Sequence, residues 1–402
     1  MNILSSIAGI INRYFGVYFE SLPEFYLKNF SVLVQGLISN EYDSISKIAS
    51  CPLNSMSHST LTRFLSSYEE FWKELEKVFQ ETVQGDDVKH RILIADDSLL
   101  EKRGKHIPYV SKAYDHCTGH FKNAQTILTI GESSKGRFHP RDILFSEFTD
   151  KDRGKQQNSR NEMLVNWLRD NKQENTILVA DSWYTNSYLI EACNLWFDSS
   201  FIGMMKGNRI LKLSEEEDEK KISELVNSVP LYRKTFVRGQ RIKYHSFEVL
   251  AKSIRHPVKI VVTELENGNR AALVSSNVNL SSEDIITYYS RRWSIEVFFK
   301  FAKQNLGLGK CHLRSLSGQR HYMILVSIAY LVVNDLKEYI RDKAKPKETF
   351  DFFVFLKMAL SVMISMKCDM AVKSFNLLND DVSQFLCRSP DLLHSPLLSR
   401  TS

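Results

Sequence analysis

Three acidic residues follow apolar runs that have the composition of buried strands. The segment ILIADDS carries Asp96 and Asp97 at its end, and ILVADSWYTN carries Asp181 directly after a similar run. Strands that are apolar on both faces lie in the middle of a sheet, so acids at the ends of two such strands can meet at one edge. Carboxylates that close together need a cation between them, and Mg²⁺ prefers hard oxygen ligands of this kind. The pattern indicates a metal site, although single acids at strand ends are also common in ordinary loops.

A further acid lies in the otherwise apolar segment YYSRRWSIEVFFKFAKQN, residues 288–305. Four of its residues are polar at regular spacing: Tyr289, Arg292, Glu296 and Lys303. In one continuous helix they would fall within an arc of roughly 80°, because each residue turns the helix by about 100°. An ion pair between Arg292 and Glu296 would explain a buried carboxylate, which is costly when unpaired. The polar line spans about four turns, however, more than one pair requires, and favours a metal ligand flanked by groups that contact phosphate.

The composition is that of an ordinary globular protein with a weak excess of positive charge. The 402 residues are 43% hydrophobic and 25% charged, with a formal net charge of +6. This length predicts two or three structural units, and the charge permits a polyanionic partner without requiring one. Six cysteines are scattered without a CxxC motif, which is typical of a reducing cytoplasm and excludes a disulfide scaffold. The apolar run Tyr322–Val333 is too short to span a bilayer, so we expect no membrane association.

Residues 1–85 are predicted to be helical, with periodic apolar positions and little strand signal. Ser57–Leu75 begins with Ser and Thr, which favour helix starts, and it follows a short helical piece at Ser44–Ser50. Two short helices joined by a turn fit either a DNA-binding helix-turn-helix or an ordinary helical hairpin.

Residues 86–205 alternate between strand and helix signals, which predicts a mixed α/β layer fold. Besides the two acid-tipped runs, the expected strands are Ala124–Gly131, Arg137–Phe145 and Ser200–Met205. Helices are expected after Ser159, which can form a capping box with Glu162, and over Asn186–Asn194. Three neighbouring residues of metal-ligating type have no second ligand cluster and are interpreted as a polar turn: His116, Cys117 and His120.

Residues 206–274 are predicted to form a β-rich insertion, with a hairpin turn at Glu266–Asn269. The insertion carries many cations, which can lie on phosphates or simply form a solvated face: Arg233, Lys234, Arg238, Arg241, Lys243, Lys252, Arg255 and Lys259. Residues 275–335 are expected to complete the core with the helix that bears Glu296. Residues 336–402 are expected to stay helical to about residue 388 and to end in an irregular tail.

Three blocks of this sequence together resemble those of bacterial insertion-sequence transposases with a DDE catalytic triad. The spacing Tyr289-x2-Arg292-x3-Glu296-x6-Lys303 matches that family's Tyr-Arg-Glu-Lys signature, within YYSRRWSIEVFFKFAKQNLGLG. ADDSLLEKRGK resembles the first block of the family, an aspartate followed by any residue and then Ser or Thr. ILVADSWYTN resembles the second block. The blocks occur in the family's order, and the resemblance covers about residues 90–335.

The resemblance implies a ribonuclease H-like mixed sheet with flanking helices, a β-rich insertion, and helical N- and C-terminal regions. It also implies a catalytic triad of metal ligands, which are Asp96, Asp181 and Glu296. The D-x-[ST] pattern favours Asp96 over Asp97 as the first acid, but a register error of one residue stays open. The implied cofactor is Mg²⁺, with Mn²⁺ able to substitute.

The same resemblance implies that Tyr289, Arg292 and Lys303 contact phosphates near the cleaved DNA end. The implied partners are double-stranded DNA, both transposon ends and target, and a second copy of the chain in a homodimer on the DNA. The N-terminal helices would help to recognise the terminal repeats. The expected function is a DNA transposase in the bacterial cytoplasm, associated with the nucleoid when it acts. An element-derived nuclease and a catalytically inactive DNA-binding protein are the alternatives, and the presence of all three acids disfavours the second.

Overall fold

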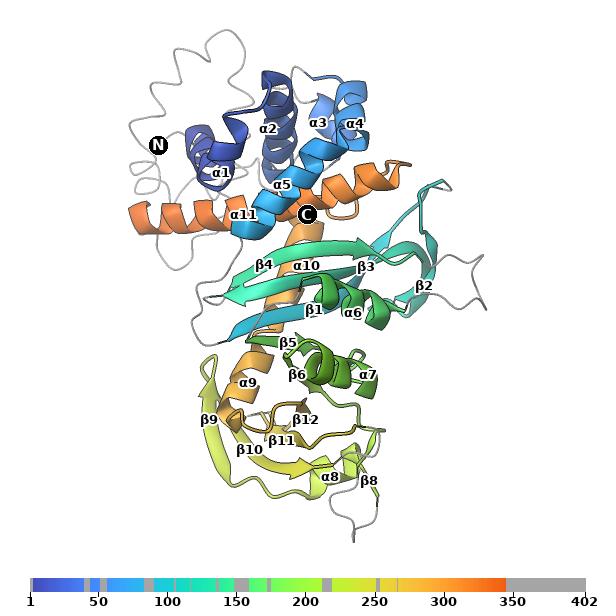
Figure 1. The fold of residues 1–402 in the computed structure, drawn as a ribbon, viewed down its shortest axis with the longest axis vertical. Coiled ribbons are helices and arrows are strands. Elements are labelled where there is room, and N and C mark those ends of the chain that lie inside the picture. The colour runs from blue at the N-terminus through green and yellow to red at the C-terminus, as the bar shows by residue number, and fades with distance from the viewer. Residues whose placement is uncertain are drawn as a thin grey trace, which may run out of the picture. The chain divides into compact units, whose positions relative to one another are not determined.

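The protein is described here from a computed structural model (Figure 1). The described residues are 3–39, 44–50, 56–82, 90–104, 106–115, 117–134, 137–147, 159–171, 175–211, 219–250, 254–265 and 267–344. The chain divides into two compact units. Residues 83–300 form the sheet unit, and residues 1–82 together with 301–402 form the helical unit.

The centre of the sheet unit is a five-stranded mixed sheet. Its strands are β1 (Arg91–Glu101), β3 (His120–Ser134), β4 (Arg137–Phe145), β5 (Thr176–Ala180) and β6 (Ser200–Met204). They lie in the order β4-β3-β1-β5-β6. β1, β3 and β4 pair antiparallel, whereas β1, β5 and β6 pair parallel. Three antiparallel strands followed by two parallel ones in this order define a ribonuclease H-like fold, as the sequence predicted.

The β-rich insertion continues this same sheet instead of forming a separate one. Its strands are β9 (Arg233–Val237), β10 (Gln240–Val249), β11 (Val258–Glu264) and β12 (Arg270–Ser275). β12 pairs antiparallel with β6, and β11, β10 and β9 follow in order (Figure 1). The pairing satisfies the backbone groups along what would otherwise be an open sheet edge at β6. Shorter elements accompany the insertion: β7 (Ile210–Leu211), β8 (Lys220–Lys221) and α8 (Ile222–Ser228).

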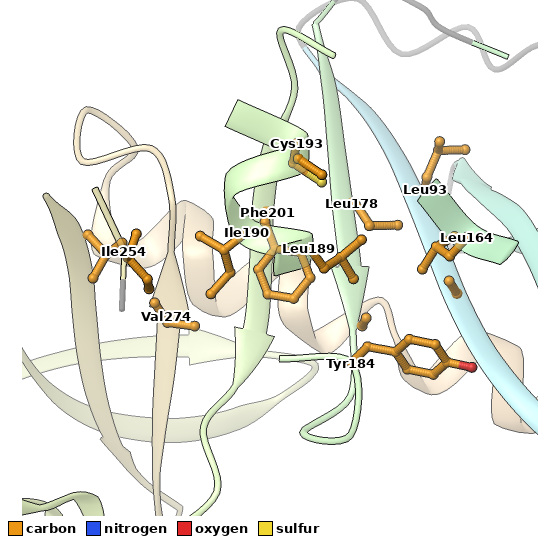
Figure 2. Packing of buried hydrophobic residues seen from close by; sticks show 14 of the residues in the cluster. Leu93, Leu164, Leu178, Tyr184, Leu189, Ile190, Cys193, Phe201, Ile254 and Val274 are labelled. Atoms are coloured by element: carbon orange, nitrogen blue, oxygen red, sulfur yellow. The ribbon is translucent and has the colours of Figure 1, made fainter. Parts of the chain in front are cut away.

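One face of the sheet is covered by helices that pack a large apolar cluster. These helices are α6 (Arg160–Asp170) and α7 (Ser187–Glu191), the latter continuing into a π-helical turn over Ala192–Trp196. Leu164 of α6, Leu189 of α7 and Phe201 of β6 are fully buried in this cluster (Figure 2). Burial of each such side chain stabilises the fold by roughly 1.5–3 kcal/mol. The ring of Tyr184 lies in the same cluster.

Two further helices carry the segment with Glu296. α9 (Ser282–Ser290) begins at the N-cap Ser281 and contacts β5, β6, β9, β11 and β12. α10 (Trp293–Asn305) packs Phe298 against Phe138 of β4, with ring centroids 5.3 Å apart. The division between the two compact units falls within α10, after Lys300.

The helical unit gathers the N-terminal helices around one long helix. Its helices are α1 (Ile3–Phe19), α2 (Glu24–Ser39), α3 (Ile45–Ser50), α4 (His58–Ser66), α5 (Glu69–Thr82) and α11 (Leu316–Ala344). α11 contacts α1, α2, α4 and α5. Its His321 ring stacks on Trp72, with centroids 4.7 Å apart, and Nδ1 of His321 donates a 2.7 Å hydrogen bond to the Leu65 carbonyl. No helix in the described part of the chain is long and apolar enough to cross a membrane.

Several expected elements differ from the structure. β2 (Ser111–Asp115) was not predicted, and the stretch 57–75 is broken between α4 and α5 at Tyr68, whose φ is 61°. The expected boundary between residues 335 and 336 falls inside α11, while residues 345–402 lie outside the described part. The helical stretch expected from residue 281 onward is interrupted twice, between α9 and α10 and between α10 and α11.

Candidate active site

The first two acids lie on adjacent parallel strands. Asp181 directly follows β5, whereas Asp96 lies within β1, just after the stretch of β1 that pairs with β5, so the strand expected to end before Asp96 continues to Glu101. In the pairing of β1 with β5, Ala95 lies opposite Ala180, so Asp96 and Asp181 are the next residues on the two strands. The strands themselves are buried because the preceding residues are almost all apolar. Side chains at matched positions of neighbouring parallel strands point to the same face of the sheet. The register therefore places Asp96 and Asp181 at neighbouring positions of the sheet.

Asp96 and Asp97 belong to opposite faces, because successive side chains of a strand alternate. Asp96 accepts a 3.1 Å hydrogen bond from Arg292, at the start of α10. Asp97 instead accepts a 3.1 Å hydrogen bond from the Tyr184 hydroxyl and pairs with Arg160 at the start of α6. Only Asp96 thus contacts the segment that carries Glu296, which favours it over Asp97 as the first acid.

Arg160, Trp183 and Tyr184 form a network around Asp97 that sequence reasoning did not identify. The Arg160 guanidinium lies 4.0 Å from the centroid of the Trp183 ring. The backbone N–H groups of Trp183 and Tyr184 donate to Oδ1 of Asp181 over 2.8 and 3.3 Å. This turn fixes the Asp181 carboxylate by local hydrogen bonds. The available signal was the segment DSWYTN itself, since an Asp at a strand end readily caps the turn that follows.

The segment with Glu296 is two helices, not one. α9 ends at Ser290, and α10 begins at Trp293. Between them the amide of Arg292 donates to the Tyr289 carbonyl over 3.0 Å, and that of Ile295 donates to the Arg292 carbonyl over 3.1 Å. These are three-residue turns, tighter than the α-helical spacing. The single polar stripe expected along one helix is therefore wrong, and Arg292 lies at the junction.

Arg292 connects the first and third acids. One terminal nitrogen donates to Asp96, and the other pairs with Glu296, four residues further along the chain. Its guanidinium also lies 6.0 Å from the centroid of the Tyr289 ring. The ion pair between Arg292 and Glu296 that the sequence offered as an alternative is thus present, and it extends across the chain to Asp96.

Burial and neighbouring charges shift the pKa values of several groups in the site. Burial and the neighbouring Asp181 carboxylate raise the pKa of Asp96 to about 7, although Arg292 opposes this shift. Burial also raises the pKa of Asp97, against the effect of Arg160. Burial opposes a charged guanidinium, but Tyr289, Glu296 and Asp96 together raise the pKa of Arg292. Clustered titratable groups with shifted pKa values are typical of functional sites.

The donor chemistry of the three acids fits a divalent metal ion. Asp96, Asp181 and Glu296 offer only carboxylate oxygens, the ligands that Mg²⁺ prefers. Within the described residues, no three His, Cys, Asp or Glu side chains lie close enough together to hold a metal ion. The Arg292 guanidinium contacts both Asp96 and Glu296, and its positive charge offsets these two carboxylates.

The two other residues predicted to contact DNA, Tyr289 and Lys303, belong to different units of the chain. Burial raises the pKa of Tyr289, and the carboxylates of Asp181 and Asp96 add to this effect. Lys303 is an exposed residue of α10 beyond Phe301, the first residue of α10 that belongs to the helical unit. From the insertion, Arg238 at the turn between β9 and β10 donates a 3.3 Å hydrogen bond to the carbonyl of Ser290.

The ribonuclease H-like sheet places Asp96 and Asp181 on neighbouring strands, and Arg292 links Asp96 to Glu296 on α10. Comparison with known families then gives the class of protein. Residues 88–332 match the family model of the transposase DDE domain. The chain belongs to this family of transposases. No curated protein matches the chain.

Several solved structures also match the chain. One is the cryo-EM structure of the piggyBac transposase synaptic complex with hairpin DNA. The two chains share 14% sequence identity. Their alignment covers 88% of this chain and 75% of the piggyBac chain, with a TM-score of 0.46.

Proposed function

We propose that this protein is a DNA transposase that cuts DNA at the ends of an insertion sequence and joins the freed 3′-OH ends to target DNA. The observation that carries the proposal is the placement of the three acids. Asp96 and Asp181 lie at neighbouring positions just beyond the paired stretch of β1 and β5, and Arg292 contacts both Asp96 and Glu296. Membership of the transposase family supports the reaction class.

Asp96, Asp181 and Glu296 are the residues that we propose hold the metal. DDE transposases generally use divalent metal ions, and the all-carboxylate donor set supports Mg²⁺, with Mn²⁺ as a substitute. When bound, such ions supply an activated nucleophile and stabilise the leaving 3′ oxygen of the cleaved strand. The chain's own contribution is to orient the carboxylates, through the turn that holds Asp181 and through the strand pairing that sets Asp96 beside it.

We further propose that double-stranded DNA is the partner, with Tyr289, Arg292 and Lys303 on phosphates near the cut. The guanidinium group of Arg292 is planar and has donors on both terminal nitrogens. The same geometry that pairs it with two carboxylates here would let it bind a phosphate. A homodimer on two DNA ends completes the proposal. We also propose a cytoplasmic location, which the scattered cysteines support.

The test uses the purified chain with duplexes taken from the DNA that flanks its coding sequence on both sides. With Mg²⁺ present, we expect nicking at a fixed position in each flank and transfer of the 3′ end into a plasmid. Glu296→Gln should abolish both products while leaving DNA binding intact. Nicking without transfer would support the nuclease instead, and binding without any cut by the unmodified chain would support an inactive DNA-binding protein. Full transfer by Glu296→Gln would overturn the triad.

A further inference from the structure

The hairpin of β2 and the start of β3 has one face that the proposed chemistry does not use. Strand pairing sets Lys112 opposite Asn123 and Tyr114 opposite Phe121, so these four side chains share a face. All four are exposed, with Phe121 at 69% and Tyr114 at 44% of their full surface. The two rings pack edge to face, with centroids 5.3 Å apart. A hollow of about 480 Å³ adjoins them, lined by Lys112, Phe121, Lys122 and Asn123.

The tip of this hairpin is rigidly closed. Oδ1 of Asp115 accepts from the Cys117 amide over 2.9 Å, and Oδ2 accepts from Thr118 and Lys122 over 3.0 and 2.8 Å. Gly119 completes the turn with φ 70°, a conformation that favours glycine. The base is also anchored, since the Gln125 side chain donates to the Pro108 carbonyl over 2.7 Å. The exposed aromatic pair is therefore held in place and not merely attached to a loose loop.

The face of the hairpin that bears Tyr114 and Phe121 carries positive charge, which favours an anionic partner. Lys112 contributes a cation to the face, and none of the four residues on it is acidic. The tip's one acid, Asp115, lies on the opposite face, where Lys122 and the turn amides compensate it. An amine, an amide and a phenol are groups that contact the phosphates and sugars of duplex DNA, and the Phe121 ring beside them can pack on a sugar.

Strand register sets the distance from this face to the proposed cut. Asp96 lies opposite Thr129 of β3, and Phe121 lies on the same strand, eight residues before Thr129. At about 3.3 Å per residue this is roughly 26 Å. The rise of duplex DNA is about 3.4 Å per base pair, so the same span corresponds to about eight base pairs.

We propose that the Lys112–Tyr114–Phe121–Asn123 face, called the ribbon face below, is a second DNA-binding surface that contacts the duplex about eight base pairs from the scissile phosphate. It deepens the proposed transposase function and rests on it. The ribbon face holds the duplex on one side of the acids, so that the scissile phosphate is fixed in position as well as bound.

The test places a photo-crosslinking amino acid at position 121 and uses the flanking-DNA duplexes of the nicking assay. We expect crosslinks six to ten base pairs from the cut, an interval set by the strand geometry of about 3.3 Å per residue. Duplexes truncated on the element side, duplexes truncated on the outer side, and target plasmid alone distinguish which DNA is held. Crosslinks confined to the cut site, or to a second copy of the chain, would overturn the proposal.

An affinity measurement supplies the matched control. Tyr114→Ala with Phe121→Ala should weaken duplex binding roughly tenfold, equivalent to about 1.4 kcal/mol of lost backbone contact. Tyr188→Ala with Trp196→Ala removes another exposed aromatic pair of the sheet unit, with centroids 5.9 Å apart, and should leave affinity unchanged. If the unmodified chain binds and nicks the duplex but the ribbon-face variant binds equally well, the proposed DNA contact of the ribbon face is wrong. The proposed transposase function is then unaffected. If the unmodified chain does neither, the proposed function itself has failed.

Discussion

Arg292 donates a 3.1 Å hydrogen bond to Asp96, a residue 196 positions earlier in the chain, while its other terminal nitrogen pairs with Glu296. One guanidinium thus neutralises two of the three proposed metal ligands. We expect a metal ion held by these carboxylates to compete with the guanidinium for them. A DNA phosphate offers the guanidinium an alternative partner of the same geometry.

The first prediction concerns this competition. In Arg292→Gln without DNA, Mn²⁺ should bind at least about tenfold more tightly, equivalent to roughly 1.4 kcal/mol of competing interaction. Titration of Mn²⁺ followed by electron paramagnetic resonance measures the affinity directly. Arg291→Gln removes the same charge from the neighbouring position and should change the affinity little. Weaker binding in Arg292→Gln would show that the guanidinium organises the acids and does not compete for them.

The second prediction separates the two adjacent aspartates. Asp96→Asn should lower the nicking rate roughly a thousandfold or more, because several kcal/mol of metal-mediated stabilisation depend on that ligand. Asp97→Asn keeps an acceptor for Tyr184 and loses only its pair with Arg160, so about a tenfold loss is expected. The exposed Asp170→Asn is the control. Equal losses in both variants, with both chains folded, would leave the first acid undecided between them and contradict the face assignment.

Helix caps and some strand limits could be predicted from the sequence because they depend on local chemistry, whereas β1 and β3 run further than their apolar stretches indicated. Ser159 caps α6 and forms a capping box with Glu162, as its spacing indicated. The strands Arg137–Phe145 and Thr176–Ala180 have the predicted limits. The three proposed acids were also identified from local patterns, since each follows or interrupts an apolar run.

What the sequence could not supply depends on contacts between distant residues. The break before α10 occurs in an apolar segment without Pro or Gly, so no local signal marks it. The contact of Arg292 with Asp96 needs that break and the packing of α10 near β1. β2 was missed because it is short and without a continuous apolar run, and it is a strand only through its pairing with β3.

A third prediction tests the phosphate contact assigned to Lys303. Lys303→Ala should weaken binding of the flanking duplex and lower the slope of log affinity against log salt by about one, because one fewer counterion is released. Binding isotherms at several salt concentrations give the slope. Arg169→Ala is the control, since Arg169 is an exposed cation of α6 that lies outside the proposed DNA contacts. An unchanged slope for Lys303→Ala would remove Lys303 from the DNA contacts.

A fourth prediction follows from the buried histidine of the helical unit. Burial lowers the pKa of His321, although the Leu65 carbonyl and Glu69 oppose the shift. The unfolded chain therefore binds a proton near pH 6.5 that the folded chain binds only at lower pH. Stability falls as pH decreases through that range, by up to about 1.4 kcal/mol one unit below the unfolded pKa.

Chemical denaturation at a pH above and a pH below this range measures the effect. His321→Gln keeps a donor for the Leu65 carbonyl but cannot titrate, so its stability should depend less on pH than that of the unmodified chain. His58→Gln, at an exposed position of α4, should leave the dependence unchanged. If His321→Gln loses the same stability on acidification as the unmodified chain, the titrating group lies elsewhere.

The last prediction links a glycine of the sheet to the second acid. A Cβ added at Gly203 of β6 would lie 2.2 Å from Oγ1 of Thr185 and 2.7 Å from the Phe201 ring. The Thr185 hydroxyl donates to the carbonyl of Asp181 over 2.9 Å, so displacing it disturbs the turn that orients that carboxylate. Gly203→Ala should therefore lower the unfolding free energy by about 1–3 kcal/mol, as overpacked cores do. It should also slow nicking under conditions where the chain remains folded. Gly9→Ala, where a Cβ meets nothing within 4 Å, should do neither. If Gly203→Ala loses stability but nicks at the unmodified rate, Thr185 is not needed to position Asp181.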